Sequence, residues 1–211
     1  SGKGFFIWDR LEDINLQAHW KEKIYNLYYI LYGGENNENN PNSFTINSEN
    51  ITLYLPTRTG YDFQKWMFYD EFTEQYIGIY DEIPSSLLRN NDLYLDAQWY
   101  AKNYTISLDV MGGDSLTYDW TNMRYNAMTD ITDICINDNT YIKRIPTKEH
   151  YDFIGWYDEN EVQYTDYEGN GIRRWDKAFD SVLYAKWQGK NYHVFLDTQD
   201  SEVVMEHPLR S

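Results

Sequence analysis

Apolar and polar residues alternate strictly in one short stretch near the middle of the chain, where residues 105–110 read Thr-Ile-Ser-Leu-Asp-Val. A period of two is typical of a β-strand with one buried and one exposed face. The related stretch 24–32 is apolar at nearly every position. It therefore predicts either a central strand of a sheet or a strand whose second face meets a neighbouring module.

Most of the remaining pattern also favours strands and loops. Residues 51–55 predict a further strand, and the Asn-rich stretch 35–43 predicts a loop that contributes nothing to a core. Helical patterning is weak, with one short helix predicted at 118–130 and another at 85–90. The chain is therefore expected to be mainly β, in the α+β class.

The chain also repeats itself. The sequence Leu-Gln-Ala-His-Trp at 16–20 returns as Leu-Asp-Ala-Gln-Trp at 95–99 and as Leu-Tyr-Ala-Lys-Trp at 183–187. Self-similarity at such a period marks a tandem array of modules. Each of these runs is predicted to be the last strand of its module, the first spanning 14–20.

Further parts of each module recur in the same order. Residues 56–66, Pro-Thr-Arg-Thr-Gly-Tyr-Asp-Phe-Gln-Lys-Trp, match Pro-Thr-Lys-Glu-His-Tyr-Asp-Phe-Ile-Gly-Trp at 146–156. Paired glycines at 33–34 and 112–113 end the first strand of each full copy. Several anchors in the same order indicate that whole modules, and not single strands, are copied.

The tryptophans that close the matching segments, Trp66 and Trp156, are out of phase with the aromatic residues before them. Tyr61 and Phe63 have the spacing of residues on one face of a strand, whereas Trp66 has the opposite parity. We therefore expect either a β-bulge near residue 65 or 155, or a tryptophan that faces outward.

These residues resemble the Listeria–Bacteroides repeat, also described as the B-repeat of internalins. Its pattern is a strand, Gly-Gly, then Pro-Thr-Arg-x-Gly-Tyr-x-Phe-x-Gly-Trp-Tyr, then Leu-Tyr-Ala-Lys-Trp, and residues 155–157 and 183–187 match it closely. The first full copy departs from it at Lys65 and Met67, and the second has His150 in place of a glycine. The resemblance implies small β-grasp-like modules in surface proteins of bacteria.

The resemblance covers nearly the whole chain, which is expected to form tandem small β-grasp-like repeat modules in an elongated array. The predicted divisions are the C-terminal part of a preceding repeat (1–20), a repeat module (21–100), a module with an insertion near 114–145 (101–188) and the start of a further, truncated repeat (189–211). A chain that opens on Ser-Gly and stops within a repeat is expected to be a segment of a longer protein.

The joints between modules are short. Four residues separate Trp99 from Tyr104, and the other two joints have the same length. Four extended residues reach about 14 Å at most, and they allow far less reorientation than a long Gly/Ser linker. The sequence therefore predicts a semi-rigid rod.

Charge narrows the possible partners. The chain has 34 Asp and Glu against 18 Lys and Arg, a formal net charge of −16. Nucleic acids and anionic membrane surfaces require a basic footprint, so neither is expected as a partner. No apolar run has the length needed for membrane insertion.

No motif indicates catalysis or a cofactor. Cys135, the one cysteine, is expected to be a small buried residue. The Gly-Asn-Gly at 169–171 predicts a turn. Four histidines follow no metal-ligand spacing, and they are His19, His150, His193 and His207.

Acidic residues leave one metal site open. Asp130, Asp133 and Asp138 lie in the insertion and could gather Ca²⁺, which prefers several oxygen ligands, although their spacing matches no known loop. The acidic residues Asp158, Glu159 and Glu161 instead predict a solvated turn.

The many aromatic residues divide into two groups. Those that recur at the same register in both full copies are expected to form the core of each module. Exposed aromatic residues found in one copy can stack on sugar rings or anchor a protein partner. The candidates for partner binding are Tyr118, Trp120, Tyr125 and Trp175 of the second full copy.

Together these features favour a non-catalytic, extracellular repeat region of a bacterial cell-surface protein, acting as a spacer or presentation stalk and in adhesion. The alternative is a module that binds an unknown glycan or protein at a host or neighbouring cell surface through the aromatic residues of the second copy. A further alternative is an accessory region of an extracellular enzyme. No cofactor is implied, and the chain itself is not expected to be an enzyme.

Overall fold

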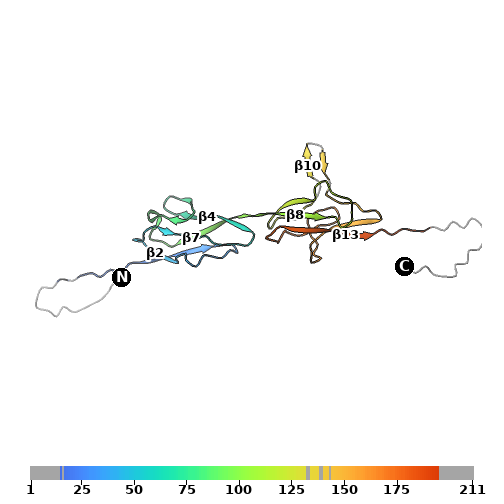
Figure 1. The fold of residues 1–211 in the computed structure, drawn as a ribbon. Coiled ribbons are helices and arrows are strands. Elements are labelled where there is room, and N and C mark those ends of the chain that lie inside the picture. The colour runs from blue at the N-terminus through green and yellow to red at the C-terminus, as the bar shows by residue number, and fades with distance from the viewer. Residues whose placement is uncertain (1–14, 16, 132–133, 138–139, 143, 195–211) are drawn as a thin grey trace, which may run out of the picture. The chain divides into compact units, whose positions relative to one another are not determined.

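The computed structural model places most of the chain. The residues it describes are 15, 17–131, 134–137, 140–142 and 144–194, without the side chains of 132–143. The chain divides into two compact units, one formed by residues 1–58 and 63–100 and the other by residues 59–62 and 101–211. Each unit has its own sheets (Figure 1). Each also has its own hydrophobic core.

The first unit is built on a five-stranded sheet in the order β2-β1-β7-β4-β5. Its strands are β1 (Ile24–Ile30), β2 (Ser43–Thr45), β4 (Tyr61–Asp70), β5 (Gln75–Ile79) and β7 (Leu93–Ala101). The first and last of these, β1 and β7, pair in parallel. β2 is antiparallel to β1, and β5 is antiparallel to β4.

Two small elements complete the first unit. β3 (Ile51–Thr52) pairs with β6 (Glu82–Ile83) in a separate antiparallel ladder. The 3-10 helix η1 (Ser85–Leu87) follows. The strand predicted at 51–55 is thus shorter than expected, and the helix predicted at 85–90 is reduced to one 3-10 turn.

The second unit has a four-stranded sheet in the order β12-β13-β8-β9. Its strands are β8 (Asn103–Asp109), β9 (Trp120–Arg124), β12 (Tyr151–Tyr157) and β13 (Ser181–Gly189). β8 and β13 are parallel, while β9 and β12 run antiparallel to their neighbours. The order repeats that of β4-β7-β1-β2, with the first and last strands again paired at the centre.

The insertion of the second unit holds more strand than expected. β10 (Ile134–Asn137) and β11 (Thr140–Ile142) form an antiparallel pair of their own. The helix predicted at 118–130 is wrong, because β9 occupies its centre. In β9, Thr121 and Met123 are buried while the residues between them are exposed, and β8 supplies the backbone hydrogen bonds. Among the described residues no helix is long and apolar enough to cross a membrane.

Side chains of β1 alternate between a buried and an exposed face, although the sequence of 24–32 shows no such alternation. Tyr25 and Leu27 lie in the core, whereas Ile24 and Tyr28 are exposed. β1 lies between β2 and β7, which confirms the prediction of a central strand. Residues 24–32 are apolar on both faces because the outer face of β1 also carries aromatic and aliphatic side chains, which are exposed.

In the second unit, a β-bulge accounts for the opposite parity of Trp156. The register of β12 against β13 shifts between Phe153 and Gly155, which confirms the bulge predicted near residue 155. Trp66 and Trp156 are both completely buried, so the outward-facing alternative is wrong.

The stretch predicted as a strand at 14–20 has no regular structure at residues 17–20, and Trp20 is 92% exposed. In both full repeats the last strand depends on a parallel first strand beside it. Among the described residues no strand takes that place for this segment, so its backbone groups lack the ladder that a strand requires.

The Asn-rich loop does contribute to the interior, against expectation. Asn40 is 5% exposed. Its side-chain amide donates to the carbonyl of Tyr54 at 2.9 Å, and its side-chain oxygen accepts the N–H of the same residue at 2.6 Å. One buried asparagine therefore satisfies both backbone groups of a segment that has no strand partner.

Candidate functional site

The last tryptophan of each repeat fastens the final strand to the turn that follows the first strand. The indole N–H of Trp99 donates to the carbonyl of Leu31 at 3.0 Å, and that of Trp187 donates to the carbonyl of Val110 at 3.0 Å. The bonded residues are 68 positions apart in the first repeat and 77 in the second. Because the same bond occurs in both repeats, the closing tryptophan has a structural role.

The second glycine of each pair makes room for that tryptophan. A Cβ added to Gly34 would lie 2.6 Å from Cζ2 of Trp99, and one added to Gly113 would lie 2.6 Å from Cζ2 of Trp187. Such distances are too short for real carbon contacts, so the Gly-Gly of the repeat is required by the tryptophan that closes it.

The recurrent phenylalanine joins the two tryptophans of each repeat. Phe63 packs against Trp66 and Trp99 with ring centroids 5.1 and 5.5 Å away. Phe153 has the same two neighbours at 5.4 and 5.7 Å. The expectation that the recurrent aromatic residues form the cores is confirmed for the phenylalanines and tryptophans, which are therefore not available to a ligand. It is wrong for the recurrent tyrosine, because Tyr151, the counterpart of Tyr61, is 42% exposed.

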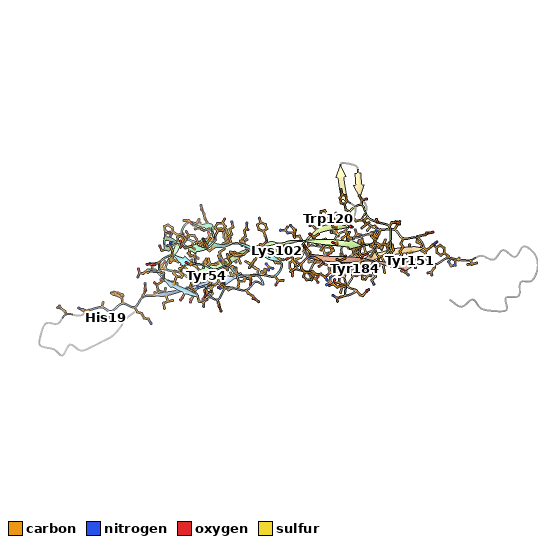
Figure 2. The ribbon with its side chains drawn as sticks, viewed as in Figure 1. His19, Tyr54, Lys102, Trp120, Tyr151 and Tyr184 are labelled. Atoms are coloured by element: carbon orange, nitrogen blue, oxygen red, sulfur yellow. The ribbon has the colours of Figure 1, made fainter. Side chains whose placement is uncertain are left out.

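The four aromatic candidates of the second repeat are not alike. Tyr118 and Trp120 are 40% and 47% exposed, and Figure 2 shows the Trp120 side chain on β9. Tyr125 is half-buried. Trp175 is completely buried, so its assignment as a surface contact is wrong.

Trp175 instead fastens the insertion to the rest of the second repeat. Its backbone N–H donates to the carbonyl of Ala127 at 2.8 Å, its carbonyl accepts the N–H of Asn126 at 2.8 Å, and its ring packs 5.2 Å from that of Tyr164. Trp175 occurs only in the second repeat because it packs on an insertion that only this repeat has. The absence of a counterpart in the first repeat therefore did not indicate that Trp175 is exposed.

The acidic turn after β12 is only partly solvated. Asp158 is 5% exposed and accepts hydrogen bonds from the backbone N–H groups of Asn160 and Val162, both at 2.9 Å. Lys177 lies 3.0 Å from Asp158 and 2.7 Å from Glu159. The prediction of a solvated turn is therefore wrong for Asp158, which is part of a buried ion pair.

The ion pair shifts both pKa values toward the charged forms. Burial opposes ionisation of Asp158, but the Val162 N–H and Lys177 outweigh it and hold the pKa of the carboxyl below its usual value. Burial likewise opposes protonation of Lys177, but hydrogen bonds to Glu159 and Asp158 raise its pKa.

Asp158→Asn is expected to lower the stability of the second repeat by about 3 kcal/mol at neutral pH, because it leaves the Lys177 charge without its buried partner. Since the folded pKa of Asp158 is depressed, its contribution is present above the unfolded value of about 3.9 and is lost as the pH falls through the folded value. Urea unfolding of both proteins between pH 2 and 7 measures this. A difference that stays constant down to pH 2 would contradict the assignment.

The proposed Ca²⁺ ligands are only partly described. The Asp130 carboxylate accepts the N–H of Gly171 at 2.7 Å. Asp133 and Asp138 lie outside the described residues. Within the part of the chain that is described, no three His, Cys, Asp or Glu side chains gather as metal ligands would. The site therefore stays a prediction.

The side chain of Cys135 and all of His207 also lie outside the description. His19 is exposed, and Nδ1 of His150 lies 3.0 Å from the hydroxyl of Tyr192. The turn lies slightly before the predicted position 169–171, because the N–H of Gly169 donates to the carbonyl of Asp166 at 3.1 Å and Gly171 already pairs with Thr165 in an isolated β-bridge.

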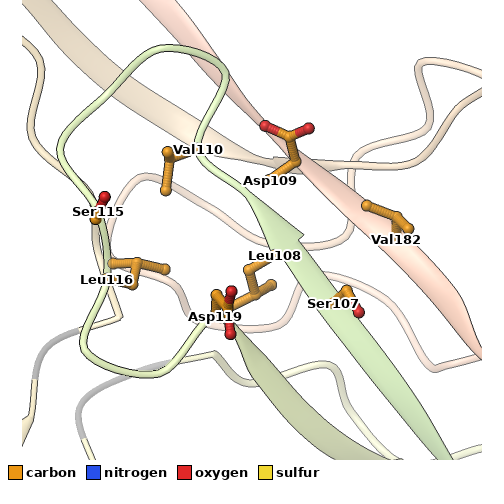
Figure 3. A pocket seen from close by; sticks show the side chains of 8 residues that line it. All are labelled: Ser107, Leu108, Asp109, Val110, Ser115, Leu116, Asp119 and Val182. Atoms are coloured by element: carbon orange, nitrogen blue, oxygen red, sulfur yellow. The ribbon is translucent and has the colours of Figure 1, made fainter.

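A hollow beside β8 opens on the surface of the second repeat (Figure 3). The residues lining it are Ser107, Leu108, Asp109, Val110, Ser115, Leu116, Asp119 and Val182. The Asp109 carboxylate accepts the N–H of Met111 at 2.8 Å. The lining has no histidine, cysteine or lysine, and its polar side chains are two carboxylates and two serine hydroxyls.

The main surface feature that the sequence did not reveal is on the first repeat. Four tyrosines of the five-stranded sheet are 43% to 71% exposed on the face away from the core, and they are Tyr28, Tyr69, Tyr76 and Tyr94. The apolar outer positions of 24–32 were a signal for one of them. The other three come from β4, β5 and β7, and their convergence required the sheet order.

The fold and its recurring anchors define a tandem repeat protein, in which one small β-sheet module with a Gly-Gly turn and a closing tryptophan occurs twice. The Listeria-Bacteroides repeat domain matches residues 25–87 and 104–186. The chain belongs to this family, as the resemblance of its motifs implied. The first matched region holds four strands of the first sheet and ends before β7, and the second spans the four-stranded sheet of the second unit.

Two relatives of this chain are much longer proteins. A protein of Evansella cellulosilytica, provisionally named a membrane protein, is 26% identical over 191 residues, covering 90% of this chain and 25% of its own length. A provisionally named Gly-rich membrane protein of the same organism is 25% identical over 197 residues, covering 92% and 20%. The chain thus spans a quarter or less of the relatives it matches.

Proposed function

We propose that this chain is a non-catalytic repeat region of an extracellular, cell-surface protein, and that its modules act as force-resistant, semi-rigid spacers that present another part of the protein for adhesion. The observation that carries the proposal is the parallel pairing of the first and last strands, β1 with β7 and β8 with β13. Each module thereby receives the chain at one end of its central strand pair and releases it at the other.

Parallel pairing determines how a module meets tension. When the two ends of the module are pulled apart, the paired strands slide past one another, and the hydrogen bonds between them are loaded together. Bonds loaded together resist more force than bonds that open one after another. The same order of strands, with the first and last parallel at the centre, supports the β-grasp-like description of each module.

The sequence and the relatives support the location and the lack of catalysis. The relatives carry names of membrane proteins. The phenylalanines and tryptophans of the repeat motif pack in the cores, where they cannot contact a substrate. Only Lys102 lies between β7 and β8, and so short a joint supports a semi-rigid spacer. A net charge of −16 favours solubility and disfavours nucleic acid and anionic membranes as partners.

Single-molecule force spectroscopy tests the spacer role. Pulling the Cys135→Ser chain from cysteines introduced before β1 and after β13 is expected to give two separate unfolding events. Each repeat of about 80 residues should release roughly 20–30 nm, given a maximum of about 3.6 Å per residue.

The control changes the pulling direction and not the repeat. Handles at positions 28 and 94, which pair with one another and are both exposed, peel β1 and β7 apart one bond at a time. The first repeat is expected to open at a clearly lower force in this geometry. Equal forces in the two geometries, or unfolding without discrete events, would contradict the proposal.

A further inference from the structure

The outer face of the first repeat carries two pairs of exposed tyrosine rings, which we call the tyrosine face. Tyr28 of β1 and Tyr94 of β7 are directly paired and stacked, with ring centroids 4.8 Å apart and planes inclined by 18°. Tyr69 of β4 and Tyr76 of β5 are also paired, with centroids 5.1 Å apart. Because β7 and β4 are neighbours in the sheet, the two pairs lie on adjacent strands of one surface.

A hollow lies within this surface. Three of the four tyrosines line it, together with Glu71, Asn91, Asp92, Leu93 and Asp96. Oδ1 of Asp92 accepts the backbone N–H of Asn26 at 2.7 Å, and Oδ1 of Asp96 accepts the hydroxyl of Tyr32 at 2.7 Å. These bonds orient the carboxylates, while further acceptor positions on each remain for a ligand.

The chemistry of the hollow matches a neutral sugar chain. Flat, half-exposed tyrosine rings give apolar surface for the C–H face of a pyranose ring and lose little conformational entropy on contact. Carboxylate oxygens accept hydrogen bonds from sugar hydroxyls. The lining has three carboxylates and no lysine or arginine, so it would repel polymers that carry uronate or phosphate groups.

The tyrosine face is a property of one repeat and is not needed by the fold. The positions of Tyr28 and Tyr94 are occupied in the second repeat by Ser107 and Val182, which lie at the same register of β8 and β13. That repeat forms the same central strand pair without the rings. Packing therefore explains the recurrent aromatic residues, whereas it does not explain these.

We propose that the tyrosine face of the first repeat binds a neutral polysaccharide, with the rings that line the hollow, Tyr69, Tyr76 and Tyr94, packing on its sugar rings and Asp92 and Asp96 accepting its hydroxyl groups. Tyr28 stacks on Tyr94 and holds that ring in place. The assignment is independent of the spacer role. It moves ligand recognition from the aromatic residues of the second repeat to the sheet of the first.

Affinity electrophoresis of the full chain tests the proposal, with soluble neutral glucan, mannan, xylan and galactan in the gel and polygalacturonate as the charged comparison. At least one neutral polymer is expected to retard the protein. The Tyr28→Ser/Tyr94→Val double variant, which installs the residues of the second repeat, should weaken that interaction at least about tenfold. Tyr118→Ala/Trp120→Ala, which removes exposed rings elsewhere, should leave it unchanged.

Thermal unfolding of each variant separates binding from folding, and a second variant covers the case of a destabilised double variant. Tyr76→Ala alters a ring that is 71% exposed on the edge strand β5, so the fold should tolerate it while affinity falls. Three results would overturn the proposal: no retardation by any neutral polymer, retardation that folded tyrosine variants retain in full, or equal retardation by polygalacturonate.

Discussion

Gly155→Lys, which installs the residue found at the matching position of the first repeat, is expected to prevent the second repeat from folding. Gly155 has a φ of 141°, a conformation that other residues rarely adopt. A Cβ there would lie 2.3 Å from the carbonyl oxygen of Thr165. That oxygen cannot move away easily, since the hydroxyl of Thr165 accepts the N–H of Trp156 at 3.0 Å and the N–H of Tyr164 donates to the carbonyl of Trp156 at 2.8 Å.

The expected cost exceeds about 4 kcal/mol, a large part of the stability of a small domain. Urea unfolding followed by near-ultraviolet circular dichroism should lose the transition of the second repeat and keep that of the first. The matched control is Lys65→Gly in the first repeat. There β4 pairs with the regular strand β5, whereas the second repeat has the segment around Thr165 against Gly155, and this change should cost about 1 kcal/mol or less. Two intact transitions in Gly155→Lys would show that the backbone at Thr165 can move to accommodate the side chain.

Trp187→Ala is expected to cost about 3–5 kcal/mol, the usual range for removing a large packed aromatic side chain. The ring packs against Phe153, fills the space beside Gly113 and donates to the carbonyl of Val110. Loss of the ring therefore detaches β13, the last strand, from the turn that follows β8, the first strand. Calorimetry should show the second repeat melting far below its normal temperature.

Two further variants resolve the contributions. Trp187→Phe keeps most of the apolar surface but leaves the Val110 carbonyl without its donor, and it should cost between about 1 and 3 kcal/mol. Trp120→Ala removes an exposed tryptophan from the same repeat and should change stability by about 0.5 kcal/mol. A cost for Trp187→Ala no larger than that of Trp120→Ala would exclude the fastening role.

The repeat itself made the cores predictable. Trp66, Trp156 and the phenylalanines before them recur at fixed register, and residues that recur in every copy are those on which every copy depends. The alternation in 105–110 and the closing runs 95–99 and 183–187 likewise predicted the central strands. Neither inference needed knowledge of which strands are neighbours.

The features that were missed depend on distant partners. β9 has a period of two over only five residues, and β8 is what makes it a strand. Burial of Asp158 depends on Lys177, nineteen positions further along the chain. The tyrosine face joins four strands, and no local pattern reveals which strands lie together. Trp175 was misassigned because the insertion packs on it and buries it in the core of the second repeat.

The parallel strand pair at the centre of each repeat also sets the order in which the module can fold. Asn26 bonds to a residue 66 positions later, and Thr105 to one 75 positions later. As the chain is synthesised from its N-terminus, the first strand must wait with an unpaired edge until almost the whole module has emerged. Such distant pairing makes closure slow and exposes the edge to mispairing. The closing runs 95–99 and 183–187 share one motif, so the closing strand of one copy can in principle pair with the opening strand of another, and such an exchange would link two repeats.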